Sequence, residues 1–191
     1  LNPTKIPYHD PFLLKDMEKA CQRLLLALKN KEKICIYGDY DVDGVSSTAL
    51  LMTVFTKLGF NIDYYLPDRH SEGYGLHIES LQKLIPKYDL LITVDCGITA
   101  LDEVDYAKDK IDMIITDHHL PREILPDAFA IINPTQTQCN YPNKNLCGVG
   151  VAFKLCQGLY QSLNKDIHEL ENYLDIVALG TIADIVPLVD E

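Results

Sequence analysis

Carboxylates and imidazoles follow three separate apolar stretches of this sequence, at 33–38, 89–94 and 112–116. In chain order these polar residues are Asp39, Asp41, Asp43, Asp95, Asp117, His118 and His119. Crowded carboxylates raise one another's pKa unless cations neutralise them. Oxygen ligands with one or two imidazoles suit Mn²⁺ or Mg²⁺, whereas zinc more often recruits cysteine or additional histidine. The residue types therefore predict divalent-cation chemistry, and two ions about 3.5–4 Å apart are the usual device for hydrolysing phosphoesters.

These groups meet only if the three stretches are parallel strands of one sheet. Short apolar runs alternate with helical patterns along the chain, which is typical of βαβ units. The continuous apolar character of 90–94 fits a strand that is covered on both faces. We therefore expect an α/β fold with a mostly parallel sheet flanked by helices on both faces. The carboxyl ends of such strands lie at one edge, where ligands bind.

Hydrophobic spacing and terminal signals give the expected elements. Strands are expected at 33–37, 61–66, 89–94, 112–116 and 128–132, and helices at 13–28, 45–58, 77–84, 100–108, 149–163 and 167–179. Asp41 and Asp43 alternate in sequence, so an extended loop would point both the same way. Gly44 would turn this loop into the following helix, and Lys154 is expected to face solvent, as lysine usually does.

Helix N-termini near the acidic groups are candidates for phosphate binding, because their exposed N–H groups favour an anion. Ser46 and Ser47 lie at the expected start of one helix, and Gly148 and Gly150 at the start of another. We therefore expect all four residues to contact a substrate phosphate.

Two further polar residues have more than one interpretation. Arg69 lies in the loop 67–75, where it either pairs with Glu72 or grips a phosphate through its fork of donors. Asp184 lies among apolar residues, where a carboxylate is costly unless it is paired or metal-bound. From the residues alone it is either a cation ligand or a helix cap.

Composition excludes several classes of protein. The 191 residues are 47% hydrophobic and 24% charged, which suits one large domain with its own core. No apolar run is long enough to span a bilayer, which argues against a membrane protein. Six cysteines without a C-x-x-C pair argue against a zinc ribbon and favour a reduced, cytoplasmic protein. The net charge of −11 argues against a broad basic groove, so strong nucleic-acid binding would need residues from elsewhere.

Ordered motifs carry a resemblance to a known family. The segments at 38–44 (GDYDVDG), 94–97 (VDCG) and 116–119 (TDHH) resemble successive motifs of the DHH phosphoesterase superfamily. The segments at 10–11, 67–75, 147–155 and 178–188 narrow the resemblance to RecJ-like single-stranded-DNA-specific exonucleases. The match spans nearly the whole chain in the right order, which is far more specific than any one motif.

The resemblance implies a role for each residue of the acidic cluster. The implied metal ligands are Asp41, Asp43, Asp95, His118 and Asp184, with Asp95 as the bridge. Asp39 is implied as a ligand or an outer-sphere carboxylate, and Asp117 as the partner that orients an imidazole. His119 would face the substrate phosphate or support a metal, so the catalytic set is Asp95, His118 and His119. The implied cofactors are two divalent cations, with Mn²⁺ preferred and Mg²⁺ as the alternative.

The resemblance also implies an activity: hydrolysis of single-stranded DNA from its 5′ end, in DNA repair and recombination. A single-strand-binding protein or a helicase is an implied partner. One alternative is a superfamily phosphoesterase acting on oligoribonucleotides, cyclic dinucleotides or pyrophosphate. Such relatives place a histidine ahead of the paired aspartates, where this chain has Tyr37-Gly38-Asp39. The other alternative is a non-catalytic replication scaffold. Such a scaffold would lack several of the ligand residues, whereas this chain has a suitable residue at every ligand position.

We expect residues 1–191 to form one DHH domain, opened by a helical segment at 1–30. The chain begins without methionine and ends abruptly after Asp190-Glu191, so we expect a fragment. The DHH-associated domain and the OB-type domain that the resemblance implies would then lie outside these residues.

Overall fold

A parallel sheet forms the centre of the protein. The computed structural model describes residues 8–69 and 72–191, so the first part of the 1–30 segment and two residues of the 67–75 loop lie outside the described residues. Within them a five-stranded sheet has the order β2-β1-β3-β4-β5, and every strand pair is parallel. The strands are β1 (Lys33–Gly38), β2 (Asn61–Tyr65), β3 (Leu90–Val94), β4 (Asp112–Thr116) and β5 (Ala130–Ile132). This confirms the α/β class.

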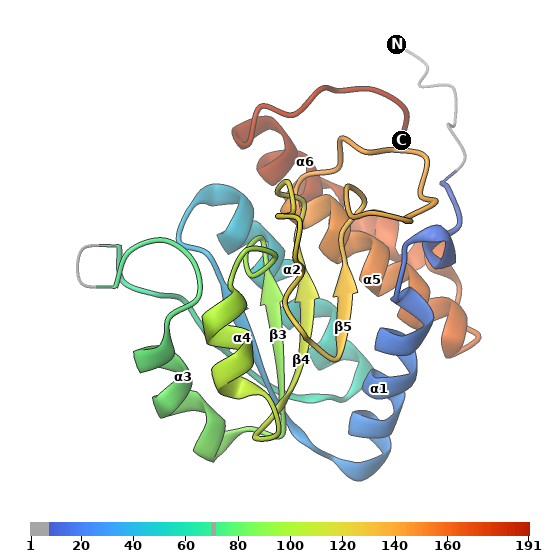
Figure 1. Cartoon of the computed structure of the whole chain (residues 1–191). Helices are drawn as coiled ribbons and strands as arrows, with labels where there is room; N and C mark the ends of the chain where they lie inside the picture. The colour runs from blue at the N-terminus through green and yellow to red at the C-terminus, as the bar shows by residue number, and fades with distance from the viewer. Residues whose placement is uncertain (1–7, 70–71) are drawn as a thin grey trace.

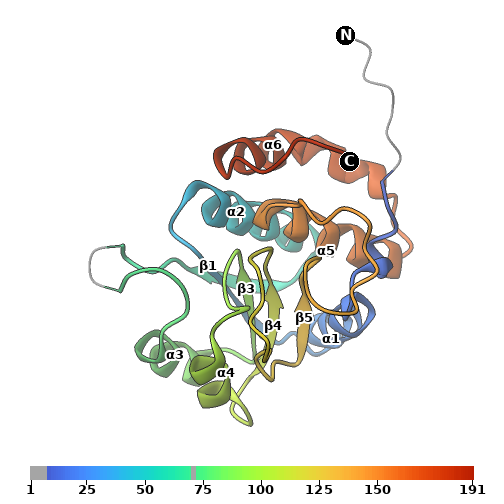
Figure 2. The same ribbon diagram turned by 45° about the horizontal axis from the view of Figure 1, so that its top comes forward.

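Helices cover both faces of the sheet (Figures 1 and 2). One face carries α1 (Met17–Asn30), α2 (Val42–Leu58) and α5 (Gly148–Ser162), and the other carries α3 (Ile78–Leu84) and α4 (Leu101–Ala107). The remaining helix, α6 (Leu174–Ala183), packs on α2 and α5 as an outer layer. Short 3₁₀ segments occupy Pro11–Leu13, Ile85–Lys87 and Ile167–Tyr173. The helix expected at 167–179 is therefore a 3₁₀ segment followed by α6.

The sheet separates two hydrophobic cores. Leu90, Ile92 and Val94 of β3 point into the core beneath α1, α2 and α5, whereas Leu91 points into the core beneath α3 and α4. Successive side chains of a strand point to opposite faces, so a strand buried on both faces needs apolar residues throughout. This explains the uninterrupted apolar run that the sequence shows.

The order of the strands creates a binding crevice. The helix after β1, α2, lies on one face of the sheet, while α4, the helix after β3, lies on the other. Adjacent strands whose following helices leave toward opposite faces open a crevice at their carboxyl ends. The register aligns Gly38 with Val94 and Val94 with Thr116, so the next residue of each strand begins its loop at the same level.

Helix α2 begins three residues earlier than expected. Asp41 is its N-cap, and its carboxylate accepts a hydrogen bond of 2.9 Å from the amide of Gly44. Asp43 therefore lies in the first helical turn, and the prediction that Asp41 and Asp43 point the same way from an extended loop is wrong. Gly44 lies inside the helix, where a Cβ would come within 2.5 Å of the Asp39 carbonyl oxygen. Gly44 therefore allows the start of α2 to lie close to the backbone of Asp39, and it does not form a turn.

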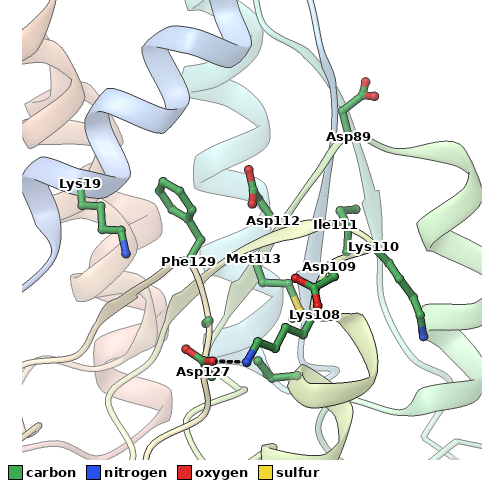
Figure 3. A pocket seen from close by; sticks show the side chains of 12 residues that line it. Lys19, Asp89, Lys108, Asp109, Lys110, Ile111, Asp112, Met113, Asp127 and Phe129 are labelled. Carbon is green, nitrogen blue, oxygen red and sulfur yellow. Dashed lines mark ion pairs between the residues drawn. The ribbon is translucent and has the colours of Figure 1, made fainter.

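A charged pocket lies at the opposite edge of the sheet (Figure 3). Its volume is about 510 Å³, and Asp89, Asp112 and Phe129 place it at the amino ends of β3, β4 and β5. Its charges are partly neutralised, since Lys108 pairs with Asp127 at 2.7 Å. The pocket is therefore separate from the acidic loops at the carboxyl ends of the strands.

The described cysteines are all free thiols, and most of them are buried in the cores. Within the described part of the chain, none of the helices combines the length and the apolar character that crossing a bilayer requires.

Candidate metal centre

The loops after β1, β3 and β4 meet the start of α2 and the end of α6 at the carboxyl edge of the sheet. Among the described residues, three groups place one ligand atom from each member within 4.8 Å of one another. They are Asp39 with Asp41 and Asp95, Asp43 with His118 and Asp184, and Asp95 with His118 and His119. Asp95 and His118 each belong to two groups, so the three groups form one continuous cluster.

His118 lies at the centre of this cluster. Its Nε2 atom is 3.2 Å from Asp95 Oδ1, 3.6 Å from Asp184 Oδ2 and 3.9 Å from Asp43 Oδ2. Within the described chain, His118 Nε2, Asp95 Oδ1 and both carboxylate oxygens of Asp39 are buried without a hydrogen-bond partner. Buried polar atoms normally have a hydrogen-bond partner. A group of potential ligand atoms that lack one and lie close together is therefore consistent with a binding site for divalent cations.

The raised pKa values of the buried carboxylates also favour bound divalent cations. Burial, followed by the charges of Asp43, Asp41 and Asp117, raises the pKa of Asp95 to about 10. Burial is also the first cause that raises the pKa of Asp39 and that of Asp43. Ionised carboxylates in this position repel one another at low dielectric, and bound divalent cations reverse that effect.

We expect Mn²⁺ to stabilise the protein more at higher pH. The pKa of Asp95 in the folded chain lies above its unfolded value of about 3.9, so the stability contributed by its neutral form is lost as pH rises toward the folded pKa. Mn²⁺ binds the ionised form and restores that stability. Thermal unfolding at about pH 6 and about pH 8, with and without Mn²⁺, measures the effect. A Mn²⁺-induced rise in Tm that shrinks with increasing pH would contradict it.

Asp117 holds the His119 imidazole in place. The Asp117 carboxylate is buried and accepts hydrogen bonds from the backbone amides of Ile98, His118 and His119 at 2.9, 2.7 and 3.1 Å. It also lies 2.7 Å from His119 Nδ1. Burial alone would raise the pKa of Asp117, but His119 and these amides outweigh it and lower that pKa. The geometry agrees with the expectation that Asp117 orients a neighbouring imidazole.

Asp117→Asn should lower kcat by about 10- to 100-fold, because an amide does not hold the His119 Nδ1 proton as a carboxylate does. Asp117 also raises the pKa of His119, so the pKa that His119 contributes to the pH–rate profile should fall in the variant. Steady-state kinetics across pH measures both effects, with single-stranded DNA, the substrate that the sequence resemblance implies. An unchanged profile would show that Asp117 has no role in orienting His119.

The second face of His119 contacts a residue that sequence reasoning did not assign to the site. Tyr74 Oη lies 3.1 Å from His119 Nε2, and the two rings meet edge to face at 6.0 Å. Tyr74 reaches the site from the loop between β2 and α3, 45 residues away along the chain. Spacing carries no signal for this contact, because only the path of the loop brings the two rings together.

The loop after β3 has an unusual backbone. Asp95 adopts a left-handed conformation with φ of 60°, and Gly97 has φ of 109°. Aspartate tolerates the left-handed region better than most residues, and such outliers gather at functional sites. A Cβ on Gly148 would lie 2.7 Å from Asp95 Oδ1. The start of α5 can therefore approach Asp95 only because residue 148 lacks a side chain.

The N-terminus of α5 receives a carboxylate from within the chain. Asp43 accepts hydrogen bonds from the amides of Gly148 at 2.6 Å and Val149 at 2.8 Å. An acidic group at this position satisfies free helix amides and complements the helix dipole. Gly150 is buried, and a Cβ there would meet Leu146. The structure therefore does not support a phosphate contact by Gly148 or Gly150, because Asp43 already occupies this helix end.

Ser46 and Ser47 are buried in the first turns of α2. The Ser46 hydroxyl donates to the Asp43 carbonyl at 3.0 Å, and a Cβ on Gly180 of α6 would come within 2.4 Å of Ser46 Oγ. The expected phosphate contacts of both serines are not supported either, because both side chains are buried and α6 covers Ser46.

Arg69 is exposed, and its guanidinium lies 5.5 Å from the centre of the Tyr40 ring. Glu72, the alternative partner that the sequence suggested, instead accepts hydrogen bonds from Tyr65 at 2.5 Å and Ser80 at 2.6 Å. A phosphate contact by Arg69 stays a prediction.

Comparison with known proteins places this geometry in a family. The family model described as "DHH family, N-terminal domain" matches residues 33–181. The single-stranded-DNA-specific exonuclease RecJ of Bacillus subtilis is 47% identical over 186 residues, covering 96% of this chain and 23% of that protein. The RecJ of Haemophilus influenzae is 44% identical over 189 residues, covering 94% of this chain and 33% of that protein. The chain thus spans about a quarter to a third of the length of these curated relatives.

Solved structures agree with the sequence relatives. A crystal structure of exonuclease RecJ bound to manganese superposes with a TM-score of 0.86 at 35% identity, covering 95% of this chain and 46% of that chain. RecJ of Thermus thermophilus in complex with Mn²⁺ gives a TM-score of 0.79 at 31% identity, covering 98% and 26%. CDC45 from Entamoeba histolytica, at 17% identity and a TM-score of 0.59, shares the fold alone. Since the family model spans most of its residues, this chain belongs to the DHH family and contains that family's N-terminal domain.

Proposed function

We propose that this chain is the catalytic core of a divalent-cation-dependent phosphodiesterase that degrades single-stranded DNA from its 5′ end. The observation that carries the proposal is the continuous ligand cluster joined by Asp95 and His118. The relatives that cover nearly all of this chain are named as single-stranded-DNA-specific exonucleases, which supports the substrate class. The 5′ polarity and the role in repair and recombination rest on the family resemblance.

Two cations fit the cluster. Asp39, Asp41 and Asp95 would hold one, and Asp43, His118 and Asp184 the other. Asp95 would be the bridge, since its Oδ1 atom lies 3.2 Å from His118 Nε2. Both Mn²⁺ and Mg²⁺ are candidates, because RecJ structures have been solved with each. Mn²⁺ is the preferred ion, since the proposed ligands combine carboxylate oxygens with an imidazole. Such a pair, when bound, would lower the pKa of the attacking water and offset charge on the phosphoryl oxygens.

His119 supplies a proton-bearing group beside this cluster. Its side chain is 43% exposed, and it borders a cavity of about 730 Å³ that Tyr74 and Gly97 also line. Asp117 raises the pKa of His119, which favours the protonated imidazole. A His119 fixed on one side by Asp117 can exchange the contact of its Nε2 with Tyr74 for a hydrogen bond to a phosphate oxygen that enters from this cavity. Arg69, on the loop that carries Tyr74, is the candidate for a second phosphate contact.

The proposal extends to the cell and to the rest of the protein. A cytoplasmic location is supported by the buried free thiols, which persist in a reducing compartment. We place binding of longer DNA in DHH-associated and OB-type domains outside these residues, because the chain is acidic and spans a minor part of its relatives. A single-strand-binding protein or helicase partner is part of the same proposal.

Digestion of labelled oligonucleotides tests the substrate. With Mn²⁺ present, the protein should release nucleotides from 5′-labelled single-stranded DNA faster than from duplex DNA of the same sequence. A preference for dinucleotides or pyrophosphate would favour another phosphoesterase of the superfamily. Calorimetric titration with Mn²⁺ distinguishes these two enzymatic functions from a non-catalytic scaffold, because a scaffold that has lost the proposed metal centre would bind no Mn²⁺.

A further inference from the structure

A buried polar cluster surrounds Lys154 of α5. Lys154 is only 2% exposed, so the expectation that it faces solvent is wrong. Its ammonium group lies 2.6 Å from Glu191 Oε2, and it donates to Gln157 Oε1 at 2.8 Å and to the His9 carbonyl at 3.1 Å. Burial lowers the pKa of Lys154, and the neighbouring Glu191 acts against that effect. A buried ammonium needs such partners, because leaving it unpaired is costly.

Glu191 is the other half of this cluster. Its side chain is 4% exposed, and its carboxylate accepts hydrogen bonds from the His9 amide at 3.1 Å and from the Tyr141 hydroxyl. The preceding residue, Asp190, lies 2.8 Å from His9 Nε2. We call Lys154, Tyr141, His9 and Glu191 the tail anchor, because they fix residues 185–191 to α5 and to two other segments.

The segment held by the tail anchor begins directly after Asp184. Asp184 ends α6, and the next residue, Ile185, has φ of 58°. A β-branched residue in the left-handed region is strained, and such a conformation persists only where the surrounding structure enforces it. Ile185 is 87% exposed, so contacts of its own side chain do not enforce the turn. Val186 packs against the core, and the anchor holds the far end.

We propose that Lys154 is a positioning residue for Asp184, acting through the tail anchor and the turn at Ile185. This inference rests on the proposed function, since it needs Asp184 to be a metal ligand. With the tail docked, the chain leaves α6 in one direction, and the Asp184 carboxylate stays 3.6 Å from His118 Nε2. With the tail released, the strained turn relaxes and Asp184 moves away from the cluster.

Calorimetric titration of Mn²⁺ into the 191-residue chain tests this coupling. Asp184→Asn identifies the binding event that depends on Asp184. Lys154→Met should weaken the same event, with Kd raised on the order of tenfold, and should leave the other event within about twofold. Combining the two substitutions should add no further loss, because both act on one ligand. Additive losses, or equal weakening of both events, would overturn the positioning role.

Two further variants complete the design. Lys57→Met removes an exposed lysine that pairs with Glu169 at 3.0 Å, and it should leave both binding events unchanged. Glu191→Gln breaks the same buried pair with little change of shape, so it decides the question if Lys154→Met does not fold. Should Glu191→Gln bind Mn²⁺ like the unsubstituted chain, the inference fails while the proposed function stands. Absence of Mn²⁺ binding by the unsubstituted chain would overturn both.

Hydrogen exchange on the unsubstituted chain provides a test without substitutions. Coupling between two sites is reciprocal, so Mn²⁺ must stabilise the docked tail by the same factor that docking adds to Mn²⁺ binding. Amides of 185–191 should therefore exchange on the order of tenfold more slowly with Mn²⁺ than without it. Unchanged exchange in this segment, at Mn²⁺ concentrations that saturate the protein, would exclude the coupling.

Discussion

Asp95→Asn should reduce exonuclease activity by at least about a thousandfold. The Asp95 carboxylate belongs to the group with Asp39 and Asp41, and it also lies 3.2 Å from His118 Nε2 of the other proposed position, so its loss affects both proposed cation positions at once. An amide of nearly the same shape keeps the packing but removes the charge that two cations would share. Nuclease assays with 5′-labelled single-stranded DNA, together with Mn²⁺ titration, measure the loss.

The same substitution should not destabilise the metal-free protein. Burial and neighbouring carboxylates raise the pKa of Asp95 to about 10, so its ionised form is a source of strain until a cation binds. The neutral amide removes that strain, and thermal unfolding without metal should show an equal or higher Tm. A variant that unfolds more easily and keeps its nuclease activity would reverse both assignments.

Gly148→Ala should lower activity by at least about a hundredfold, although it adds only a methyl group. That methyl would lie 2.7 Å from both Cβ and Oδ1 of Asp95, which no ordinary contact permits. Either Asp95 or the start of α5 must move, and α5 is held there by two amide hydrogen bonds to Asp43. The expected result is displacement of the carboxylate that both proposed cations would share, measured as lower kcat and weaker Mn²⁺ binding.

Gly150→Ala is the matched control for this prediction. It lies in the same first turn of α5, and its added Cβ would be 3.3 Å from the side chain of Leu146, which can shift slightly. Alanine also favours a helix by about 0.5–1 kcal/mol relative to glycine. Gly150→Ala should therefore keep nearly full activity. Equal losses in the two variants would mean that any side chain here damages α5, without a specific effect on Asp95.

The fold and the place of the site were predictable because strands carry a local signal. The strands at 33–38, 90–94 and 112–116 are short, apolar and β-branched, and each is followed by a carboxylate. Once they are parallel, chain geometry alone brings Asp39, Asp95 and Asp117 to one edge. No long-range information is needed for that step, since the carboxyl ends of parallel strands always share an edge.

The division of ligands within the site was not predictable from spacing. Asp41 and Asp43 are two residues apart, yet one caps α2 and faces Asp39, while the other lies in the helix and faces His118. That outcome depends on where the helix begins, which short-range patterns define least well. The phosphate contacts expected of Ser46 and Ser47 meet a related limit, because both side chains are buried, and Ser46 lies against Gly180 of α6, which packs on α2 from far along the chain.

Sequence by itself predicted the kind of chemistry. Residue types at three strand ends predicted a cation site, the family resemblance added Asp184, and the ordered motifs indicated the family. Tertiary structure alone decided which carboxylate faces which imidazole, why Gly148 must lack a side chain, and that Lys154 lies buried against Glu191. The physical reason is the range of the interactions. Strand and helix patterns reflect neighbours along the chain, whereas close approach, burial and charge pairing join residues that only the finished packing brings together.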